Sequence, residues 1–148
     1  MKVRRLTPAD ADLGASLIAK LKLRGDAAAP TRSQMSAWLA DPCHILLAAV
    51  ADGDAPVGYA VAYLMERVDG TGPMLFFYEI EVAPSARRRG VGRLLVAEMR
   101  RIAEHVGAVK MWVETDRSNM PARALYSDGQ GQESDELSVV YTWYADAA

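Results

Sequence analysis

The segment from residue 79 to residue 95 restricts the fold more than any other part of the sequence. It reads EIEVAPSARRRGVGRLL: the end of a strand, a proline-marked loop, two close glycines and the start of an amphipathic helix. Gly90 and Gly92 allow a tight turn and a close approach of the backbone to a ligand, and the first amides of the helix have no intrahelical partner. Charge is added by four arginines: Arg87, Arg88, Arg89 and Arg93. The segment therefore predicts a pyrophosphate-binding loop between a strand and a helix.

Two other kinds of glycine loop do not fit this segment. The dinucleotide-binding fingerprint needs a third glycine three residues after the second, where this chain has Leu95. The loop that binds nucleoside triphosphates needs the sequence Gly-Lys-Ser/Thr, which is absent. An alternative that stays open is an arginine-rich surface turn that contacts nucleic acid or only solvent.

The composition indicates one domain, residues 1–148. A chain of 148 residues with 51% hydrophobic residues builds one sizeable core but is short for two. No apolar run approaches the ~20 residues of a membrane span, and the first residues lack the apolar stretch of a secretory signal. The lone Cys43 suits a reducing cytoplasm, and His44 and His105 have no second ligand at metal spacing, so no metal is expected. The net charge of −2 gives no general attraction to nucleic acid.

Apolar periodicity and turn residues predict alternating strands and helices. Strands are expected at residues 3–6, 44–50, 57–68, 74–82, 109–114 and 137–144. Helices are expected after Thr7-Pro8 and at residues 31–39, 91–106 and 119–128. This order predicts an α/β (α+β) fold, in which a mixed sheet is flanked by helices.

The glycine–arginine loop resembles the acyl-CoA loop of the GCN5-related N-acetyltransferases (GNAT family), whose pattern after a strand is Arg/Gln-x-x-Gly-x-Gly/Ala. Arg87-Arg-Arg-Gly90-Val-Gly92 fits this pattern at every fixed position. A second stretch, Asn119-Met-Pro-Ala-Arg-Ala-Leu-Tyr126, is similar to the family's Asn-x-x-Ala-x-x-Leu-Tyr. The resemblance covers about residues 1–145 and implies the GNAT fold, a mixed, mostly antiparallel sheet of six to seven strands flanked by four helices. One difference is Gln130, which stands where the family normally has glycine and predicts a remodelled turn after Tyr126.

The resemblance also implies acetyl-CoA as co-substrate and assigns residues to it. The amide of Val82 is expected to bind the thioester carbonyl, and neighbouring amides, including that of Ala83, are expected to pair with pantetheine. The loop residues expected to bind the pyrophosphate are Arg87, Arg88, Arg89, Gly90, Val91, Gly92 and Arg93. Asn119 is expected to cap the short helix and also to contact the cofactor.

Acetyl transfer to an amine needs an acceptor for the ammonium proton, a donor to the oxyanion and a proton for the leaving thiolate. Glu79 and Glu81 alternate on one strand and are expected to share a face, opposite Tyr78, Ile80 and Val82. They are therefore candidates for general base and cation anchor. The alternative is a pair of solvent-exposed carboxylates on a half-buried strand.

Tyr126 is the candidate general acid. A phenol is able to protonate a leaving thiolate from a hydrogen-bonded position. The alternative is plain core packing, which is the commoner role of a tyrosine on an amphipathic helix. Its place within the second motif favours the acid.

Charge is unevenly distributed along the sequence. Residues 83–110 contain seven Lys and Arg against two Glu, whereas residues 111–148 contain seven Asp and Glu against two Arg. A basic segment beside an acidic one suits an anionic cofactor that faces a cationic substrate.

Three stretches resemble the small branch related to aminoglycoside 3-N-acetyltransferases: Tyr78-Glu-Ile-Glu-Val82, Trp112-Val-Glu-Thr-Asp116 and Met120-Pro-Ala-Arg-Ala-Leu-Tyr126. This resemblance implies a small cationic acceptor, an aminoglycoside or a polyamine, and places Tyr78, Glu114 and Asp116 in the substrate site. A carboxylate-lined cleft is expected from Glu79, Glu81, Asp116, Asp128, Glu133, Asp135 and Glu136.

Three other functions stay open. A protein or peptide acetyltransferase that acts on N-termini or lysines would share every motif. A non-catalytic acyl-CoA sensor would keep residues 87–92 but would not need Glu79 or Tyr126. A nucleic-acid-binding module rests on the arginine run alone. The leading interpretation is a cytoplasmic acetyltransferase of small amines, without nucleic-acid or membrane partners, for which a homodimer is an open alternative.

Overall fold

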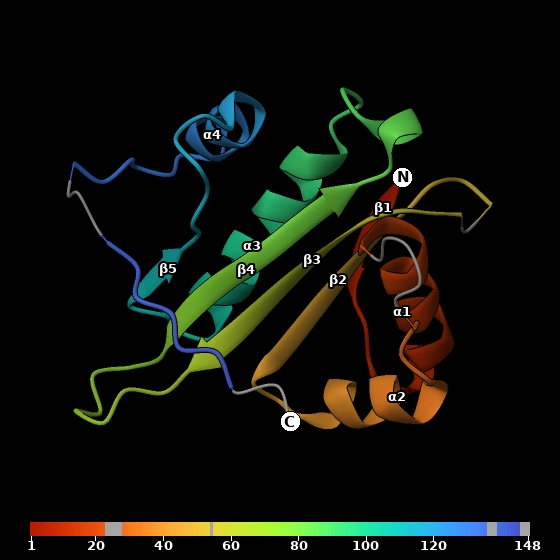
Figure 1. Cartoon of the computed structure of the whole chain (residues 1–148), viewed down its shortest axis with the longest axis horizontal. Helices are drawn as coiled ribbons and strands as arrows, with labels where there is room; N and C mark the ends of the chain where they lie inside the picture. The colour runs from red at the N-terminus through yellow and green to blue at the C-terminus, as the bar shows by residue number, and fades with distance from the viewer. Residues whose placement is uncertain (23–27, 54, 136–138, 146–148) are drawn as a thin grey trace.

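The computed structural model describes residues 1–22, 28–53, 55–135 and 139–145, which form one sheet with helices on both faces (Figure 1). The five strands lie in chain order across the sheet and are β1 (Lys2–Arg5), β2 (His44–Val50), β3 (Pro56–Met65), β4 (Met74–Val82) and β5 (Lys110–Trp112). The first four pair antiparallel, and β4 pairs parallel with β5. A parallel pair needs a crossover, which here runs through α3 (Val91–His105). The predicted mixed, mostly antiparallel sheet is confirmed.

The helices divide between the two faces of the sheet. On one face α1 (Ala11–Leu17) packs against α2 (Arg32–Ala40), and on the other lies α3, with α4 (Met120–Asp128) beside it (Figure 1). Shorter helical turns are η1 (Pro8–Asp10), the π-helical η2 (Ile18–Lys22) and η3 (Pro84–Ala86). Thr31 begins α2 with a capping box, since its side chain accepts from the Gln34 amide and the Gln34 side chain accepts from the Thr31 amide.

The core consists of two apolar layers, one on each face of the sheet. Because side chains alternate along a strand, β2 contributes Ile45 and Leu47 to the α3 layer and Leu46 to the α1–α2 layer. Leu95 and Met99 of α3 are fully buried in their layer, as the predicted helix periodicity requires. The buried face of α3 therefore holds the helix against the sheet, with its first turn in the glycine–arginine loop at Gly90 to Gly92.

A β-bulge in β4 changes the predicted orientation of Tyr78. Val61 of β3 pairs with Glu79 and the next residue, Ala62, pairs with Phe77, so Tyr78 is the extra residue between them. Ile80 and Val82 pack against the α3 layer, as Phe77 does before the bulge. The ring of Tyr78 instead contacts Tyr63, whose own neighbours are in the α1–α2 layer. The prediction that Tyr78 lies on the face of Ile80 and Val82 is therefore wrong, whereas Glu79 does lie opposite Ile80.

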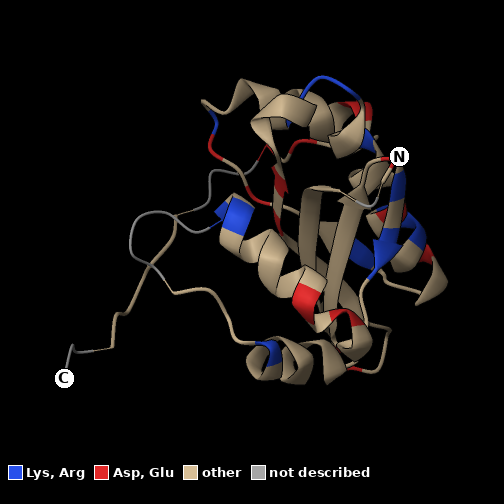
Figure 2. Cartoon of the chain, turned by 90° about the vertical axis from the view of Figure 1, so that its right-hand side faces the viewer, with Lys and Arg blue, Asp and Glu red and all other residues tan. Residues whose placement is uncertain are grey.

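The predicted number of strands was too high. The sheet of the described residues has five strands instead of six to seven, β3 ends at Met65 instead of residue 68, and β5 is confined to residues 110–112. Of the expected final strand, residues 137 and 138 lie outside the described residues, and residues 139–144 form no strand. Residues 139–144 lie away from the body of the molecule (Figure 2), and the side chains of Val140 and Trp143 are 81% and 86% exposed. The residue types of this segment favour a strand, but no strand of the described residues pairs with it. No helix among the described residues is long and apolar enough to cross a membrane.

Candidate active site

The glycine–arginine loop adopts the conformation that an anion cradle requires. Gly90 has a φ of 82° and is the N-cap residue of α3. An added Cβ at Gly90 would meet no atom within 4 Å, so the glycine is required by the backbone angle and not by lack of space. The amide of Leu94 donates to the Gly90 carbonyl (3.1 Å), which leaves the amides of Val91, Gly92 and Arg93 as the unbonded first turn of the helix.

Gly92 has a packing role that the sequence did not predict. A Cβ at Gly92 would lie 3.1 Å from Cδ2 of Leu125, a residue of α4. The missing side chain therefore lets α3 and α4 pack closely. The close approach at Gly92 is to the protein's own helix, and only the amide of Gly92 remains for a ligand.

The four loop arginines do not all face outward as free charges. Nε of Arg87 donates to the carbonyl of Val82 (3.1 Å), and Arg93 forms an ion pair with Asp128 of α4 (2.6 Å). Arg88 and Arg89 are exposed and form no ion pair with any described residue. Asp128 thus neutralises Arg93, whereas Arg87 bonds to an uncharged carbonyl and keeps its positive charge, as Arg88 and Arg89 do. Arg87 and Arg93 also hold the loop to β4 and α4.

The edge of β4 that faces β5 is unpaired over its last residues. The β4–β5 ladder ends at Phe76 and Trp112, whereas β4 continues to Val82. The amide of Ala83 donates to the Val57 carbonyl on the β3 side (2.8 Å), so it is not available to pantetheine. Since backbone groups alternate in direction along an antiparallel strand, the amides of Ile80 and Val82 point to the open edge. This edge runs directly into the glycine–arginine loop.

The Glu79 carboxylate is held by two neighbours, Tyr59 and Lys22. The hydroxyl of Tyr59, a fully buried residue of β3, donates to its Oε1 (3.2 Å). The ammonium of Lys22, at the end of η2, lies 2.8 and 2.9 Å from the two carboxylate oxygens. The same ammonium lies 5.7 Å from the ring centroid of Tyr78. Sequence reasoning missed both Lys22 and Tyr59, because neither belongs to a motif.

Glu81 lies in the same part of the molecule but in a more open position. It lines a depression of about 240 Å³ together with Lys20, Leu21 and Val82, next to the start of the loop. Glu81 forms no ion pair with any residue that the structure describes. Of the two glutamates, Glu81 is therefore the better placed to accept a proton from an entering amine.

Tyr126 lies on α4, where its ring packs edge-on against Phe77 of β4 with 6.1 Å between centroids. Burial raises the pKa of the Tyr126 phenol above its ordinary value, and the hydroxyl is protonated at neutral pH with or without this rise. A protonated phenol is the form that an acid catalyst requires. At the other end of α4, Asn119 caps the helix by accepting from the Ala122 amide (3.2 Å), as predicted.

The turn after Tyr126 is regular, so the predicted remodelling is wrong. The amide of Gly131 donates to the Tyr126 carbonyl and the amide of Gln130 donates to the Ser127 carbonyl, both at 2.9 Å. These bonds form the usual Schellman ending of a helix. Gln130 occupies the left-handed position with a φ of 64°, where glycine is normally preferred.

Replacing Gln130 by glycine is expected to stabilise the fold by about 1 kcal/mol, because it removes the left-handed strain of a side-chain-bearing residue. The midpoint of chemical denaturation measures the effect. Gln132→Gly is the matched control, since Gln132 does not have a positive φ. It is expected to lower stability or leave it unchanged. An equal effect of both substitutions would contradict the strain argument.

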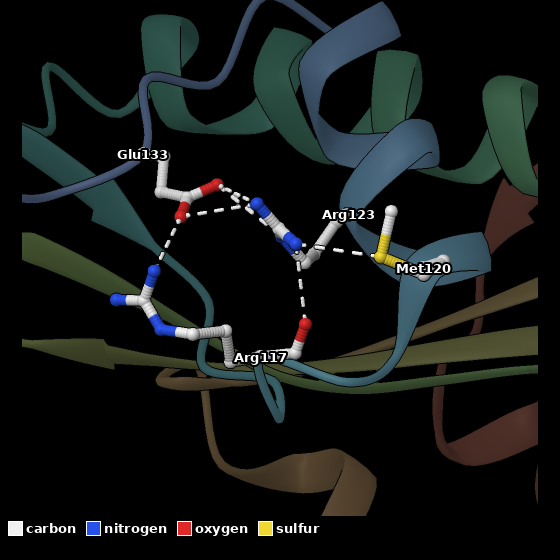
Figure 3. Close-up of polar contacts among 4 residues, drawn as sticks. All are labelled: Arg117, Met120, Arg123 and Glu133. Atoms are coloured by element: carbon white, nitrogen blue, oxygen red, sulfur yellow. Dashed lines mark hydrogen bonds and ion pairs between the residues drawn. The ribbon is translucent and has the colours of Figure 1, made fainter.

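The predicted carboxylate-lined cleft is partly neutralised by the protein's own arginines. Asp128 pairs with Arg93 (2.6 Å), and Glu133 pairs with Arg117 (3.4 Å) and Arg123 (2.9 Å). Figure 3 shows both arginines converging on Glu133 from the segment before α4 and from α4 itself. The charges of these two carboxylates are therefore already paired with arginines and are less available to bind a cation.

The remaining acidic residues are placed differently. Glu114 and Asp116 are exposed in the segment between β5 and α4, and Asp135 is exposed after α4. None of these three carboxylates forms an ion pair with a described residue. Glu136 lies outside the described residues.

A family model described as "Acetyltransferase (GNAT) family" matches residues 17–131, a range that contains β2 to β5, the glycine–arginine loop and α4. The chain belongs to the GNAT family. The five-stranded sheet and four main helices of its described residues are the GNAT fold.

Individual relatives agree with this family. Streptothricin acetyltransferase of Streptomyces lavendulae is 36% identical over 76 residues, which are 51% of this chain and only 38% of that relative. An aminoglycoside acetyltransferase from an uncultured soil metagenomic sample has a crystal structure that is similar over 97% of this chain and 98% of its own, with 25% identity and a TM-score of 0.82. A ribosomal-protein-alanine N-acetyltransferase from Brucella melitensis is similar in fold over 97% of this chain and its entire length, with 22% identity and a TM-score of 0.75.

Proposed function

We propose that this GNAT protein is a single N-acetyltransferase domain that moves the acetyl group of acetyl-CoA to a primary amine of a small cationic molecule, by direct attack in a ternary complex. The observation that carries the proposal is the open edge of β4, which ends beside the positive first turn of α3. The extended thioester arm of acetyl-CoA would fit along the unpaired edge of β4. The pyrophosphate of acetyl-CoA would fit at the N-terminus of α3.

The residues at this edge fit acetyl-CoA, which supplies an activated acyl thioester. The first-turn amides after Gly90 and the side chains of Arg88 and Arg89 would hold the pyrophosphate. The outward amide of Val82 would bind the thioester carbonyl, and such a donor is typically worth about 3 kcal/mol in acyl transfer. Arg87 contributes indirectly, because its bond to the Val82 carbonyl fixes the peptide beside the donor amide.

Three side chains would handle the amine and the protons. Glu81, in the depression beside Val82, accepts a proton from the entering ammonium, directly or through water. Glu79 binds the positive charge of the acceptor. The hydroxyl of Tyr126 gives a proton to the departing thiolate.

The acceptor is proposed to be an aminoglycoside or a related polyamine. Support comes from the relatives named for aminoglycosides and streptothricin. It also comes from three carboxylates that form no ion pair with a described residue: Glu81, Glu114 and Asp116. Tyr78 adds an exposed aromatic face on which a cation can lie. The fold itself does not select the acceptor, because a ribosomal-protein-alanine N-acetyltransferase shares it.

A thiol-release screen tests this proposal directly. Acetyl-CoA is offered with aminoglycosides, with polyamines and with short peptides that have free N-termini or lysines, and release of CoA is followed by a thiol reagent. Turnover of aminoglycosides or polyamines is the expected result. Turnover of peptides alone would replace the proposal by a protein acetyltransferase, and acetyl-CoA binding without any turnover would replace it by a sensor.

Tyr126→Phe is expected to lower kcat by about 10²-fold while the Kd for acetyl-CoA and the melting temperature stay unchanged. Phenylalanine keeps the ring that packs on Phe77 and loses only the proton. The three quantities are measured on one preparation. A variant as fast as the parent would assign Tyr126 to core packing alone.

A homodimer is also part of the proposal. The exposed side chains of Val139, Tyr141 and Trp143 offer apolar surface to a second copy. Light scattering during size-exclusion chromatography gives the mass in solution, and a monomer at all concentrations would exclude this assembly.

A further inference from the structure

Lys22 has no role in the reaction proposed above, yet its ammonium lies on Glu79, the carboxylate proposed to bind the acceptor's charge. The ammonium lies between the carboxylate of Glu79, at 2.8 and 2.9 Å, and the ring of Tyr78, at 5.7 Å from the centroid. Lys22 and Glu79 are 57 residues apart in the sequence, so the contact joins η2 to the middle of β4. A carboxylate beside an aromatic face is a recognition site for a protonated amine.

The carboxylate in this site is fixed independently of Lys22. The buried Tyr59 donates its hydroxyl to Oε1 of Glu79 (3.2 Å), and the Glu79 side chain is only 23% exposed. The Lys22 side chain is 42% exposed and ends a short helical turn. The anion is thus part of the rigid sheet, whereas the cation is at the end of a long side chain that is able to swing away.

We infer that the Lys22 ammonium occupies the subsite that binds the ammonium group of the acceptor. A cationic acceptor must displace Lys22 before it binds. The inference rests on the proposed function and adds a specificity-determining residue to it. The depression beside this site is lined by Lys20, Leu21 and Glu81, so an incoming amine meets the Lys22–Glu79 pair next to the proposed base.

The consequence is a common penalty on the binding of every amine, so that only acceptors with further positive charges bind tightly. A monoamine that displaces Lys22 exchanges one ammonium for another at Glu79 and gains little there. A polyamine makes the same exchange and places its further ammonium groups on other carboxylates. If the Lys22–Glu79 pair is formed for nine-tenths of the time, the apparent affinity of every acceptor is lowered about tenfold.

Lys22→Met tests the inference, because methionine keeps most of the apolar length and removes the charge. Spermidine and kanamycin are the probes, and binding is measured by calorimetry at low salt. The variant is expected to bind them about tenfold more tightly and to show a KM lowered by the same factor, with kcat and the Kd for acetyl-CoA within twofold of the parent. Lys2→Met is the matched control, since Lys2 lies on β1 at the far edge of the sheet and is expected to change nothing.

Unchanged or weaker binding of both probes by Lys22→Met would overturn the inference, even if the parent acetylates them. If the parent neither binds nor acetylates any amine, the proposed function fails. A separate measurement then tests whether Glu79 holds the Lys22 ammonium. The rate of labelling by an amine-reactive acetyl ester is followed by peptide mass spectrometry. Glu79→Gln is expected to speed labelling of Lys22 several-fold and leave that of Lys2 unchanged, whereas equal rates at Lys22 in parent and variant would show that the pair does not hold the ammonium.

Discussion

Gly90→Asp is expected to abolish measurable acetyl-CoA binding, while Gly90→Asn is expected to retain most of it. Both replacements have the same shape, and both residue types tolerate the left-handed conformation that Gly90 adopts at a φ of 82°. Only aspartate brings a negative charge to the proposed pyrophosphate site. Two like charges about 4 Å apart repel by about 4 kcal/mol at an effective dielectric constant of 20, which corresponds to about 10³-fold in Kd.

Calorimetric titration with acetyl-CoA measures both variants, and the melting temperature of each excludes unfolding as the cause. An added Cβ at Gly90 meets no neighbour within 4 Å, so neither replacement disturbs the packing of α3. Equal affinities of the aspartate and asparagine variants would place the pyrophosphate elsewhere. Loss of binding in both would assign the glycine to backbone approach instead of charge.

The sequence was most informative where structure depends on neighbours along the chain. β4 has the predicted bounds, residues 74–82, and α3 begins at the predicted residue 91 and ends one residue before the predicted 106. Apolar periodicity and the glycines at 90 and 107 determine these limits locally. The predicted tight turn is present at Gly90, which has a φ of 82°.

Contacts between distant parts of the chain were not predictable in the same way. The role of Gly92 depends on Leu125 in α4, and the charge of Arg93 is taken up by Asp128. A one-residue bulge turns Tyr78 to the other face of β4, although alternation along the strand gave no sign of it. Lys22 lies in no motif, and its pairing with a motif residue appears only when η2 is docked beside β4.

The final segment shows the limit of propensity. Residues 139–144 read VVYTWY, a composition typical of a strand, yet they form no strand among the described residues. A strand is stable only when a neighbour accepts and donates its backbone hydrogen bonds, and a single sequence does not reveal whether that neighbour is present.

Glu81→Gln is expected to lower kcat/KM for the best amine by between ~10² and ~10⁴-fold, because the amide has nearly the shape of the carboxylate but cannot accept the proton. The parent should lose activity as the pH falls, since a protonated carboxylate is not a base, and the variant should lack this acidic limb. Glu79→Gln is expected to act mainly on KM, because Glu79 binds charge and is oriented by Tyr59. The pH dependence of kcat and KM for both variants separates these two roles.

Glu104→Gln is the matched control for this pair, since Glu104 is an exposed residue of α3 and is expected to keep the parent's rate. The roles would be exchanged, with Glu79 as the base, if the fall in activity at low pH disappeared in Glu79→Gln and remained in Glu81→Gln. In that case the Lys22 ammonium, 2.8 Å from Glu79, would have to leave before each proton transfer. If both variants keep the parent's rate and pH profile, the proton is taken by water, and the two carboxylates serve only to attract the acceptor. The structure favours Glu81 as the base, because the Glu79 carboxylate is already shared between Tyr59 and Lys22.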